Sequence, residues 1–334
     1  MTIRLKNIER LAVIGGGAWG TALAQVAAAG GRETLIWAIE DDVVAAINKI
    51  HENPLYLKGI KLNKAIRATS NFSDLSNVDG WLVVTPAQHM RAVLSRSPCP
   101  NMPLILCSKG IEGSSGKMLH EVARDVCPTS PVAVLSGPTF AHEVAVGLPT
   151  AVTLACDDKQ LGEALRSRIN LSTFRIYLTD DVAGAEAGGA VKNVLAIACG
   201  VAEGRGLGQN ARAALIARGF AEMTRFGLAM GGRRETLAGL SGLGDLVLTC
   251  SSTSSRNFSL GLAIGEGKSA VELMSDRHTV AEGAHTAPIL HRIATERNID
   301  MPIVSAVVEL LSGQVSVGEL LETMLSRPPG DEED

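Results

Sequence analysis

Aromatic residues are scarce in this sequence. Phe, Trp and Tyr make up 3% of its 334 residues although 46% are hydrophobic, so we expect a core built from Ala, Val, Leu and Ile. A basic excess is also missing, because 31 Lys and Arg stand against 35 Asp and Glu, which gives a net charge of −4. This balance argues against a nucleic-acid partner, but it allows a local basic site for a small anion.

Cysteine and histidine occur without the spacings that signal their chemistry. The six cysteines contain no C-x-x-C pair, and Cys107 and Cys199 lie in apolar runs, which is typical of free thiols in a reducing cytosol. No two of the seven histidines stand four positions apart. The sequence therefore predicts no metal site.

Long uncharged apolar runs are absent as well. No stretch reaches the ~18 apolar residues of even hydropathy that a membrane span requires. Arg4, Lys6 and Arg10, followed by an apolar stretch at 11–29, imitate a signal peptide. The glycine spacing inside that stretch offers a better explanation. We therefore expect a soluble, cytoplasmic protein with no integral membrane segment.

Glycine is abundant, with 35 residues, and many of them stand in turn-like clusters. Near the N-terminus, Gly15, Gly17 and Gly20 form the pattern G-x-G-x-x-G. The flanking segments predict a strand at 10–14, a helix at 21–29 and a strand at 34–39. In such a unit the first glycine makes the tight turn, the second admits a pyrophosphate, and the third lets the helix pack on the strand. The pattern favours dinucleotide binding over an ordinary glycine-rich turn.

Short apolar segments continue to alternate with helical ones up to residue 179. The expected strands are 66–69, 80–85, 103–107, 132–135, 151–155 and 173–178, and the expected helices lie around 42–51, 88–95 and 117–127. This alternation predicts a parallel, doubly wound sheet with helices on both faces. Ligands of such sheets lie beyond the carboxyl ends of the strands. Lys109 follows a strand end and is a candidate anion contact, with an ordinary exposed loop lysine as the alternative.

The pattern changes from strand to helix around Thr179–Asp181. A chain of this length suggests about two domains at ~150 residues each. We expect a dinucleotide-binding domain at 1–181, an all-helical substrate domain at 182–326, and a disordered tail at 327–334. The predicted fold class is α/β, with a Rossmann-type domain followed by an all-α domain.

One predicted helix, at 183–203, is almost entirely apolar and has Lys192 in its middle. A helix that is apolar all round is surrounded by protein. A buried lysine lowers the cost of its lost hydration by a lowered pKa, which makes it a usable general base. Gly188 and Gly189 lie on the same face and would let a ligand or another backbone approach the amine. A lysine that snorkels to the surface is the alternative.

The second half also holds a Ser-rich segment at 249–257, shortly after a glycine-rich segment that ends at Asp245. Ser-rich segments are usually flexible loops. Here Ser255, Arg256 and Asn257 stand just before an apolar helix. Hydroxyl, guanidinium and helix N–H groups together suit a phosphate, so this segment is a candidate phosphate cradle.

Taken together, these motifs resemble those of the bacterial NAD(P)-dependent glycerol-3-phosphate dehydrogenases over almost the whole chain. The segments that carry the resemblance are GGGAWGTALA, NPLYLKGIKL, SKGIE, LSGPTFAHEVAVGLPTAV, GGAVKNVLAIACG, AGLSGLGDLVLTCSSTSSRN and VAEG. The resemblance implies reversible reduction of dihydroxyacetone phosphate to sn-glycerol 3-phosphate, which supplies glycerophospholipid synthesis. It also implies a homodimer in which each chain has a dinucleotide-binding domain and an all-helical domain.

The resemblance further implies roles for individual residues, with Lys192 as the catalytic proton acceptor. The implied substrate contacts are Lys109, Gly137, Thr139, Lys192, Asp245, Ser255, Arg256 and Asn257. The implied cofactor contacts are Ala18, Trp19, Lys109, Ala141, Arg256, Val280 and Glu282. The chain departs from the family at three positions. Ala18 and Thr139 stand where the family often has Ser, and Ile39 stands where Arg or His is common.

Chemistry and resemblance lead to the same expected mechanism. Hydride passes between nicotinamide C4 and substrate C2, and neutral Lys192 takes the hydroxyl proton in the oxidation direction. Lys109 would polarise the substrate oxygen or hold the phosphate, and its charge would lower the pKa of Lys192. Asp245 would orient Lys192 and oppose that lowering, so the net direction stays open. The alternatives are a related dehydrogenase for another small hydroxy substrate and a non-catalytic dinucleotide sensor.

The end of the second strand bears on the choice between NAD and NADP. Glu40 lies 25 positions after Gly15, close to the ~20-residue spacing of an acid that binds the adenosine ribose. Because Ile39 replaces a basic residue and acids follow, we expect NAD to be slightly favoured. Alternatively, the acids at 40–42 simply open the next helix, and Arg32 or Lys49 reaches a 2′-phosphate.

Overall fold

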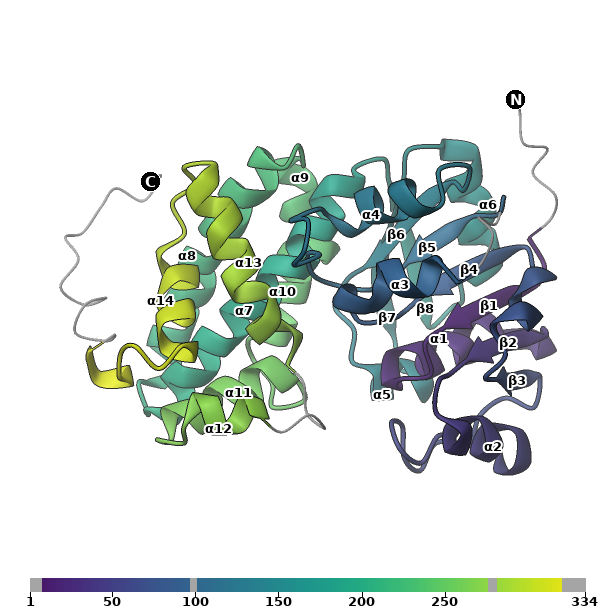
Figure 1. The fold of residues 1–334 in the computed structure, drawn as a ribbon, viewed down its shortest axis with the longest axis horizontal. Coiled ribbons are helices and arrows are strands. Elements are labelled where there is room, and N and C mark those ends of the chain that lie inside the picture. The colour runs from purple at the N-terminus through teal and green to yellow at the C-terminus, as the bar shows by residue number, and fades with distance from the viewer. Residues whose placement is uncertain (1–7, 97–100, 276–280, 320–334) are drawn as a thin grey trace.

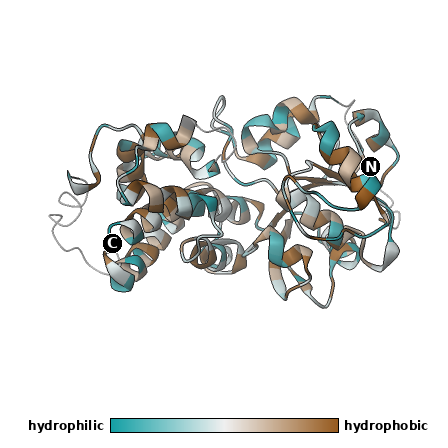
Figure 2. Cartoon of the chain, turned by 90° about the horizontal axis from the view of Figure 1, so that it is seen from below, coloured by the Kyte–Doolittle hydropathy of each residue, from teal (hydrophilic) through white to brown (hydrophobic). Residues whose placement is uncertain are grey.

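The computed structural model describes residues 8–96, 101–275 and 281–319. Val280 and the tail 327–334, which carry two of the expectations above, lie outside the described residues. A half with a sheet covered by helices comes first in the chain, and an all-helical half follows it (Figure 1). The sheet strands lie between helices and are coloured mostly hydrophobic in Figure 2.

The sheet has eight strands in the order β3-β2-β1-β4-β5-β6-β7-β8. Their bounds are β1 Leu11–Ile14, β2 Thr34–Trp37, β3 Ile66–Thr69, β4 Gly80–Val83, β5 Leu104–Leu106, β6 Val132–Ser136, β7 Thr150–Cys156 and β8 Phe174–Thr179. The strand order reverses between β1 and β4, the point at which doubly wound sheets hold their ligands. The predicted Rossmann-type sheet is confirmed, and each predicted strand is present with small shifts at its ends.

One part of the prediction is wrong, because the sheet is not parallel throughout. β7 runs antiparallel to β6, with Ser136 opposite Thr153, whereas β7 and β8 are parallel to each other. The connection between β6 and β7 contains only the five-residue helix α5 (Ala141–Ala145). A parallel crossover needs a helix that spans the sheet, and α5 is too short for that, so the chain turns back beside β6.

The other helices of this half cover the sheet, and all of them except the last lie close to where they were expected. They are α1 Ala18–Ala27, α2 Asp41–Ile50, α3 Met90–Leu94, α4 Leu119–Val126 and α6 Lys159–Ile169. α1 begins earlier than predicted, directly after Gly17, whose extended backbone forms the N-cap. The N-terminus of α1 therefore lies inside the glycine pattern.

The helical half is built around α7 (Val182–Gly204), which is buried along nearly its whole length, as predicted. The surrounding helices are α8 Gly208–Ala229, α9 Arg234–Leu237, α10 Asp245–Thr249, α11 Arg256–Gly265, α12 Ala270–Ser275, α13 Glu282–Glu296 and α14 Pro302–Leu311. By length and hydropathy α7 could cross a membrane, but 89% of its apolar window is buried inside the protein. That burial is what the central helix of a packed helical domain requires.

Glycines allow α11 to pack unusually close to α7. A Cβ added to Gly200 would lie 2.1 Å from the Phe258 carbonyl oxygen, and one added to Gly261 would lie 2.0 Å from that of Ile197. Because no side chain separates the two backbones, α11 is fixed against α7. The candidate phosphate cradle lies at the start of α11, so this contact holds it at a set distance from Lys192.

Candidate functional site

The glycine-rich turn is tightly packed on one side and open on the other. Gly15 has a φ of 124°, and a Cβ on Gly20 would lie 1.9 Å from the Gly15 carbonyl oxygen. By contrast, nothing lies within 4 Å of a Cβ added to Gly17. No side chain caps the N-terminus of α1. Free N–H groups at a helix start beside open space are suited to an anion such as a pyrophosphate.

A further close contact in the turn was not predicted. A Cβ on Gly16 would lie 2.5 Å from the Cβ of Ala38, so this glycine lets the turn pack on the segment that follows β2. The G-x-G-x-x-G pattern gives Gly16 no role, and only the fold brings Ala38 next to it. The turn is therefore shaped by four glycines.

Three buried polar atoms near the carboxyl ends of the strands have no hydrogen-bond partner within the described residues. They are Trp19 Nε1, Thr85 Oγ1 and Ser136 Oγ. Buried polar groups are normally satisfied. Trp19 belongs to the glycine turn, Thr85 follows β4 at the switch point, and Ser136 ends β6. Unpaired groups in these places fit a polar ligand bound along this edge of the sheet.

The structure brings Lys192, Lys109 and Asp245 together, although they come from α7, the loop after β5 and the start of α10. Lys192 Nζ donates to Asp245 Oδ1 and Lys109 Nζ donates to Asp245 Oδ2, each over 2.6 Å. The exposed side-chain fractions are 6% for Lys192, 14% for Lys109 and 0% for Asp245. One buried carboxylate thus bridges two ammonium groups, and the cluster carries a net positive charge.

Thr249 completes this cluster and was not predicted. Its hydroxyl accepts a hydrogen bond from Lys192 Nζ over 2.9 Å and donates to the backbone carbonyl of Asp245 over 2.6 Å. Thr249 stands four residues after Asp245, which places both on one face of α10. That spacing shows only that Thr249 shares a helix face with Asp245, and its contact with Lys192 depends on the fold.

The direction of the Lys192 pKa shift, which the sequence left open, is downward. Burial is the largest cause, and the charge of Lys109 adds to it, while the charge of Asp245 opposes it; together they lower the pKa of Lys192 to about 8. A neutral amine is therefore accessible close to neutral pH, as a general base requires. The snorkelling alternative is wrong, because Lys192 is 5% exposed.

The two glycines before Lys192 face protein. A Cβ on Gly188 would lie 2.4 Å from the Ser241 carbonyl oxygen, in a π-helical turn (Leu240–Gly244) that leads into Asp245. A Cβ on Gly189 would lie 3.3 Å from Ser136 Oγ. The sequence predicted that a ligand or another backbone would approach these glycines. At Gly188 it is a backbone, and this contact places Asp245 against α7.

The candidate phosphate cradle is partly used for the fold. Ser255 caps α11 by accepting from the Phe258 N–H over 3.2 Å, and Asn257 Oδ1 accepts from the Gly283 N–H over 2.9 Å. The Asn257 amide nitrogen and the Arg256 guanidinium make no hydrogen bond to other described residues. Arg256 is exposed. These two groups are left to meet an anion.

Glu282 begins α13, next to Gly283, and is partly buried. Burial raises the pKa of its carboxyl, while the positive charges of Arg256, Lys109 and Lys192 lower it. Glu282 is therefore within electrostatic reach of both the cradle and the lysine cluster. The structure therefore brings Glu282 near Arg256 and Lys109, two other residues that the resemblance names as cofactor contacts.

The loop after β6 lies against the lysine cluster. Lys109 Nζ is 3.4 Å from the Gly137 carbonyl oxygen, and Thr139 Oγ1 donates to the same oxygen over 3.3 Å. A Cβ on Gly137 would lie 2.9 Å from Val152 Cα. Ala141 begins α5, which packs on α1, so it lies near the glycine turn.

Glu40 forms the N-cap position of α2, and its carboxylate accepts a hydrogen bond from the Tyr56 hydroxyl over 2.8 Å. This bond, burial and the negative charge of Glu40 raise the pKa of Tyr56. Asp41 and Asp42 stand in the first turn of α2, as the alternative for these acids proposed. Ile39 is 66% exposed.

Neither basic residue suggested for a 2′-phosphate lies at this end. Arg32 precedes β2 and so lies at the amino end of that strand, whereas Glu40 follows its carboxyl end. Arg32 donates to the Arg168 carbonyl oxygen over 2.8 Å. Lys49 is in the last turn of α2, about 13.5 Å along the helix from Glu40. In this structure neither side chain is close to Glu40.

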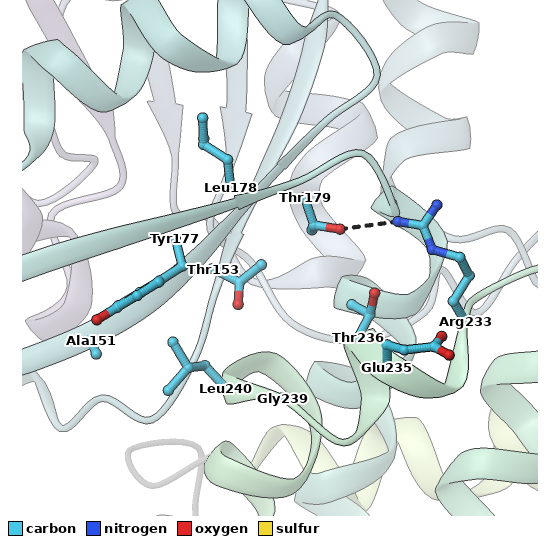
Figure 3. A pocket seen from close by; sticks show the side chains of 10 residues that line it. All are labelled: Ala151, Thr153, Tyr177, Leu178, Thr179, Arg233, Glu235, Thr236, Gly239 and Leu240. Atoms are coloured by element: carbon cyan, nitrogen blue, oxygen red, sulfur yellow. Dashed lines mark hydrogen bonds between the residues drawn. The ribbon is translucent and has the colours of Figure 1, made fainter.

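A hollow of about 890 Å³ lies between the sheet edge formed by β7 and β8 and the segment from α9 to the π-helical turn (Figure 3). Its lining includes Tyr177, Thr153, Thr236 and Leu240. The hollow contains none of the predicted site residues. No three His, Cys, Asp or Glu side chains among residues 8–96, 101–275 and 281–319 are grouped so that they could hold a metal ion.

The glycine turn at the switch point and the buried lysine against the sheet edge define the class of nicotinamide-dependent oxidoreductases with a helical second half. Comparison with known proteins agrees. The family model for the NAD-dependent glycerol-3-phosphate dehydrogenase N-terminus matches residues 10–162, and the model for its C-terminus matches residues 181–322. The chain belongs to the NAD(P)-dependent glycerol-3-phosphate dehydrogenases.

Individual relatives cover almost the entire chain. The glycerol-3-phosphate dehydrogenase [NAD(P)+] of Erythrobacter litoralis is 60% identical over 95% of this chain and 96% of its own. That of Novosphingobium aromaticivorans is 59% identical over the same shares. The crystal structure of glycerol-3-phosphate dehydrogenase from Coxiella burnetii superposes with a TM-score of 0.91 at 37% identity, over 96% of this chain and 99% of that one.

Proposed function

We propose that this enzyme reversibly reduces dihydroxyacetone phosphate to sn-glycerol 3-phosphate with NAD(P)H, and that Lys192 is its general acid and base. The observation that carries the proposal is the buried Lys192–Asp245–Lys109 cluster at the carboxyl edge of the sheet. The names of the relatives supply the substrate class. The proposal of a dinucleotide cofactor is supported by the glycine turn with Gly15, Gly17 and Gly20.

The residues present fit a nicotinamide dinucleotide. The open side of Gly17 and the uncapped start of α1 would hold its pyrophosphate, with Ala18 and Trp19 beside it. Glu40 would meet the adenosine ribose, and Ala141, Arg256 and Glu282 would complete the contacts. When bound, the nicotinamide supplies or accepts the hydride.

Lys192 moves the proton. In the oxidation direction its neutral amine accepts the proton of the substrate C2 hydroxyl, and in reduction its ammonium returns a proton to the carbonyl oxygen. Asp245 holds the amine in place and stabilises the ammonium form. Thr249 fixes the remaining geometry of Nζ. Lys109 directs a second positive charge at the oxygen on which negative charge develops during reduction.

Arg256 and the amide of Asn257 would hold the substrate phosphate. Charge-assisted hydrogen bonds to a phosphate are the strong ones, and Arg256 has no ion pair among the described residues that would compete. Ser255 stands in the N-cap of α11, so the start of that helix adds N–H groups. Gly137 and Thr139 lie on the Lys109 side of the same space.

We propose that the chain divides at residues 181 and 182 into a dinucleotide-binding domain and a substrate domain. The end of β8 at Thr179 and the start of α7 at Val182 support this division. We further propose a cytoplasmic homodimer that supplies glycerophospholipid synthesis. NAD is the favoured cofactor in this proposal, because Glu40 rather than a basic side chain stands at the end of β2.

The test is to follow NADH and NADPH oxidation with dihydroxyacetone phosphate as the acceptor. We expect turnover with this substrate and far weaker turnover with dihydroxyacetone, which lacks the phosphate. Equal rates with both would favour a dehydrogenase for another small hydroxy substrate. Binding of NADH without turnover of any such substrate would favour a dinucleotide sensor.

A further inference from the structure

A loop away from the lysine cluster joins two parts of the proposed dinucleotide site, those for the pyrophosphate and for the adenosine ribose. It runs from His51 to Leu62, between α2 and β3, and a backbone hydrogen bond from the Leu62 N–H to the His51 carbonyl (2.8 Å) closes it. Leu57, Ile60 and Leu62 are buried in the core of the sheet half. These three side chains therefore fix the position of the loop against the core.

Asn53 connects this loop to the glycine turn. Its side-chain Nδ2 donates to the Gly16 carbonyl oxygen and to Thr21 Oγ1, each over 2.8 Å. Asn53 has no exposed surface, so it supports the turn from behind. Gly16 packs on Ala38 as well. One carboxamide thus ties the turn to the first helical residues that follow it.

The same loop reaches Glu40, the residue proposed to meet the adenosine ribose, through Tyr56. Asn53 Oδ1 accepts from the Tyr56 N–H over 3.2 Å, and the Tyr56 hydroxyl donates to Glu40 over 2.8 Å. A continuous series of hydrogen bonds therefore runs from Gly16 through Asn53 and Tyr56 to Glu40. These end points are the parts proposed to meet the pyrophosphate and the adenosine ribose of one dinucleotide.

We propose that Asn53 is a positioning residue for the cofactor, and that the loop 51–62 is a brace that holds the pyrophosphate turn and Glu40 at a fixed spacing. The inference rests on the proposed function of the turn and of Glu40. Backbone N–H groups bind a phosphate best when they are already oriented. Without the brace, part of the binding free energy is spent on ordering the turn.

The experiment compares Asn53→Ala with Asn63→Ala. Asn63 is a matched control because its Nδ2 also donates to a backbone carbonyl of the α1 region, that of Ala28 (2.9 Å), but at the far end of the helix. We measure the Kd of NADH without substrate, and the hydrogen exchange of the peptide 15–21 without cofactor. Asn53→Ala should weaken NADH binding roughly tenfold, as the loss of its two hydrogen bonds to the glycine turn and α1 implies, and should speed exchange in that peptide.

Asn63→Ala should leave both quantities near wild type, and kcat at saturating NADH should change little in either variant. Equal weakening of NADH binding by the two variants, or none by Asn53→Ala, would overturn the proposal. If Asn53→Ala does not fold, Asn53→Leu keeps most of the side-chain volume without the two donors and without a charge, and is held to the same criterion.

Tyr56→Phe tests the second half of the brace. It should weaken NADH binding a few-fold and leave exchange in the peptide 15–21 unchanged, because Glu40 alone loses its support. No change in NADH binding would remove Glu40 from the brace. NADH binding is measured without dihydroxyacetone phosphate, so a wrong substrate leaves this test intact. Failure of the wild-type protein to bind NADH would instead overturn the proposed function itself.

Discussion

The proposed catalytic centre and the proposed phosphate cradle of the helical half are built in opposite ways. Lys192 and Asp245 are buried, and both oxygens of the carboxylate are bonded. Arg256, in contrast, is exposed and has no ion pair among the described residues, and only its neighbours Ser255 and Asn257 are bonded within the fold. The group proposed to transfer the proton is thus prearranged by its hydrogen bonds, while the charge proposed to bind the anion makes no such bond to the described residues.

The largest expected effect comes from breaking the prearranged centre. Lys192→Ala should lower kcat by ~10²–10⁴-fold, because general acid–base catalysis typically contributes that much. Lys192→Met keeps most of the buried volume and should be equally inactive. Thermal unfolding of both variants is measured to check that they fold. Lys61→Ala, which removes an exposed lysine paired with Glu52, is the control. Turnover near wild type in Lys192→Met would remove Lys192 from the mechanism.

Removing the exposed charge of the phosphate cradle should have a smaller effect than removing Lys192, and it should change substrate binding rather than kcat. Arg256→Ala should raise KM for glycerol 3-phosphate about 10–100-fold, since hydrogen bonds to charged groups are worth about 1.5–3 kcal/mol. Stability should hardly change because Arg256 is exposed. The comparison to make is the preference for glycerol 3-phosphate over glycerol. If that preference survives in Arg256→Ala, the phosphate is held elsewhere.

The pH dependence sharpens the contrast, because it concerns the buried centre. Burial lowers the pKa of Lys192 to about 8, and oxidation needs the neutral amine, which predominates above that pH. The rate of glycerol 3-phosphate oxidation should therefore rise about tenfold per pH unit below 8 and level off above it. Reduction needs the ammonium and should fall above pH 8. The same profile in Lys192→Met, measured on residual activity, would assign the titration to another group.

The smallest expected effect concerns the cofactor. Ile39→Arg should shift the ratio of kcat/KM for NADH and NADPH a few-fold towards NADPH, because an Arg here would meet a 2′-phosphate. The reference is the wild-type ratio at one pH and salt concentration, where we expect NADH to be used at least as well. A clear wild-type advantage for NADPH would contradict the role given to Glu40.

Local signals in the sequence were sufficient for the positions of the strands and for the lysine helix. Strand lengths, glycine spacing and the apolar run around Lys192 are properties of neighbouring residues, so β3 was predicted with its observed bounds. The downward pKa shift was open because it depends on burial and on two opposed charges at set distances.

Contacts between distant segments escaped prediction. Thr249 is explained only once Lys192 lies beside it, and Asn53 only once the loop is folded under Gly16. The seam between Gly200 and Gly261 likewise depends on how two helices cross. No period or motif of neighbouring residues encodes these pairs. The antiparallel β7 was missed for a similar reason, since an αβ alternation looks the same whichever way the strand returns.

That reversed strand decides where the chain leaves the sheet. Because β7 and β8 run against β6, the chain exits at Thr179, level with Val134 in the middle of β6, and heads away from the carboxyl end of that strand. The first turns of α7 must travel back across the sheet, and by Gly189 they are alongside Ser136, the last residue of β6. Three residues later, ~4.5 Å further along the helix, comes Lys192. The length of α7 thus brings the chain back past the last residue of β6, and the amine of Lys192, the proposed general base, lies just beyond the end of that strand.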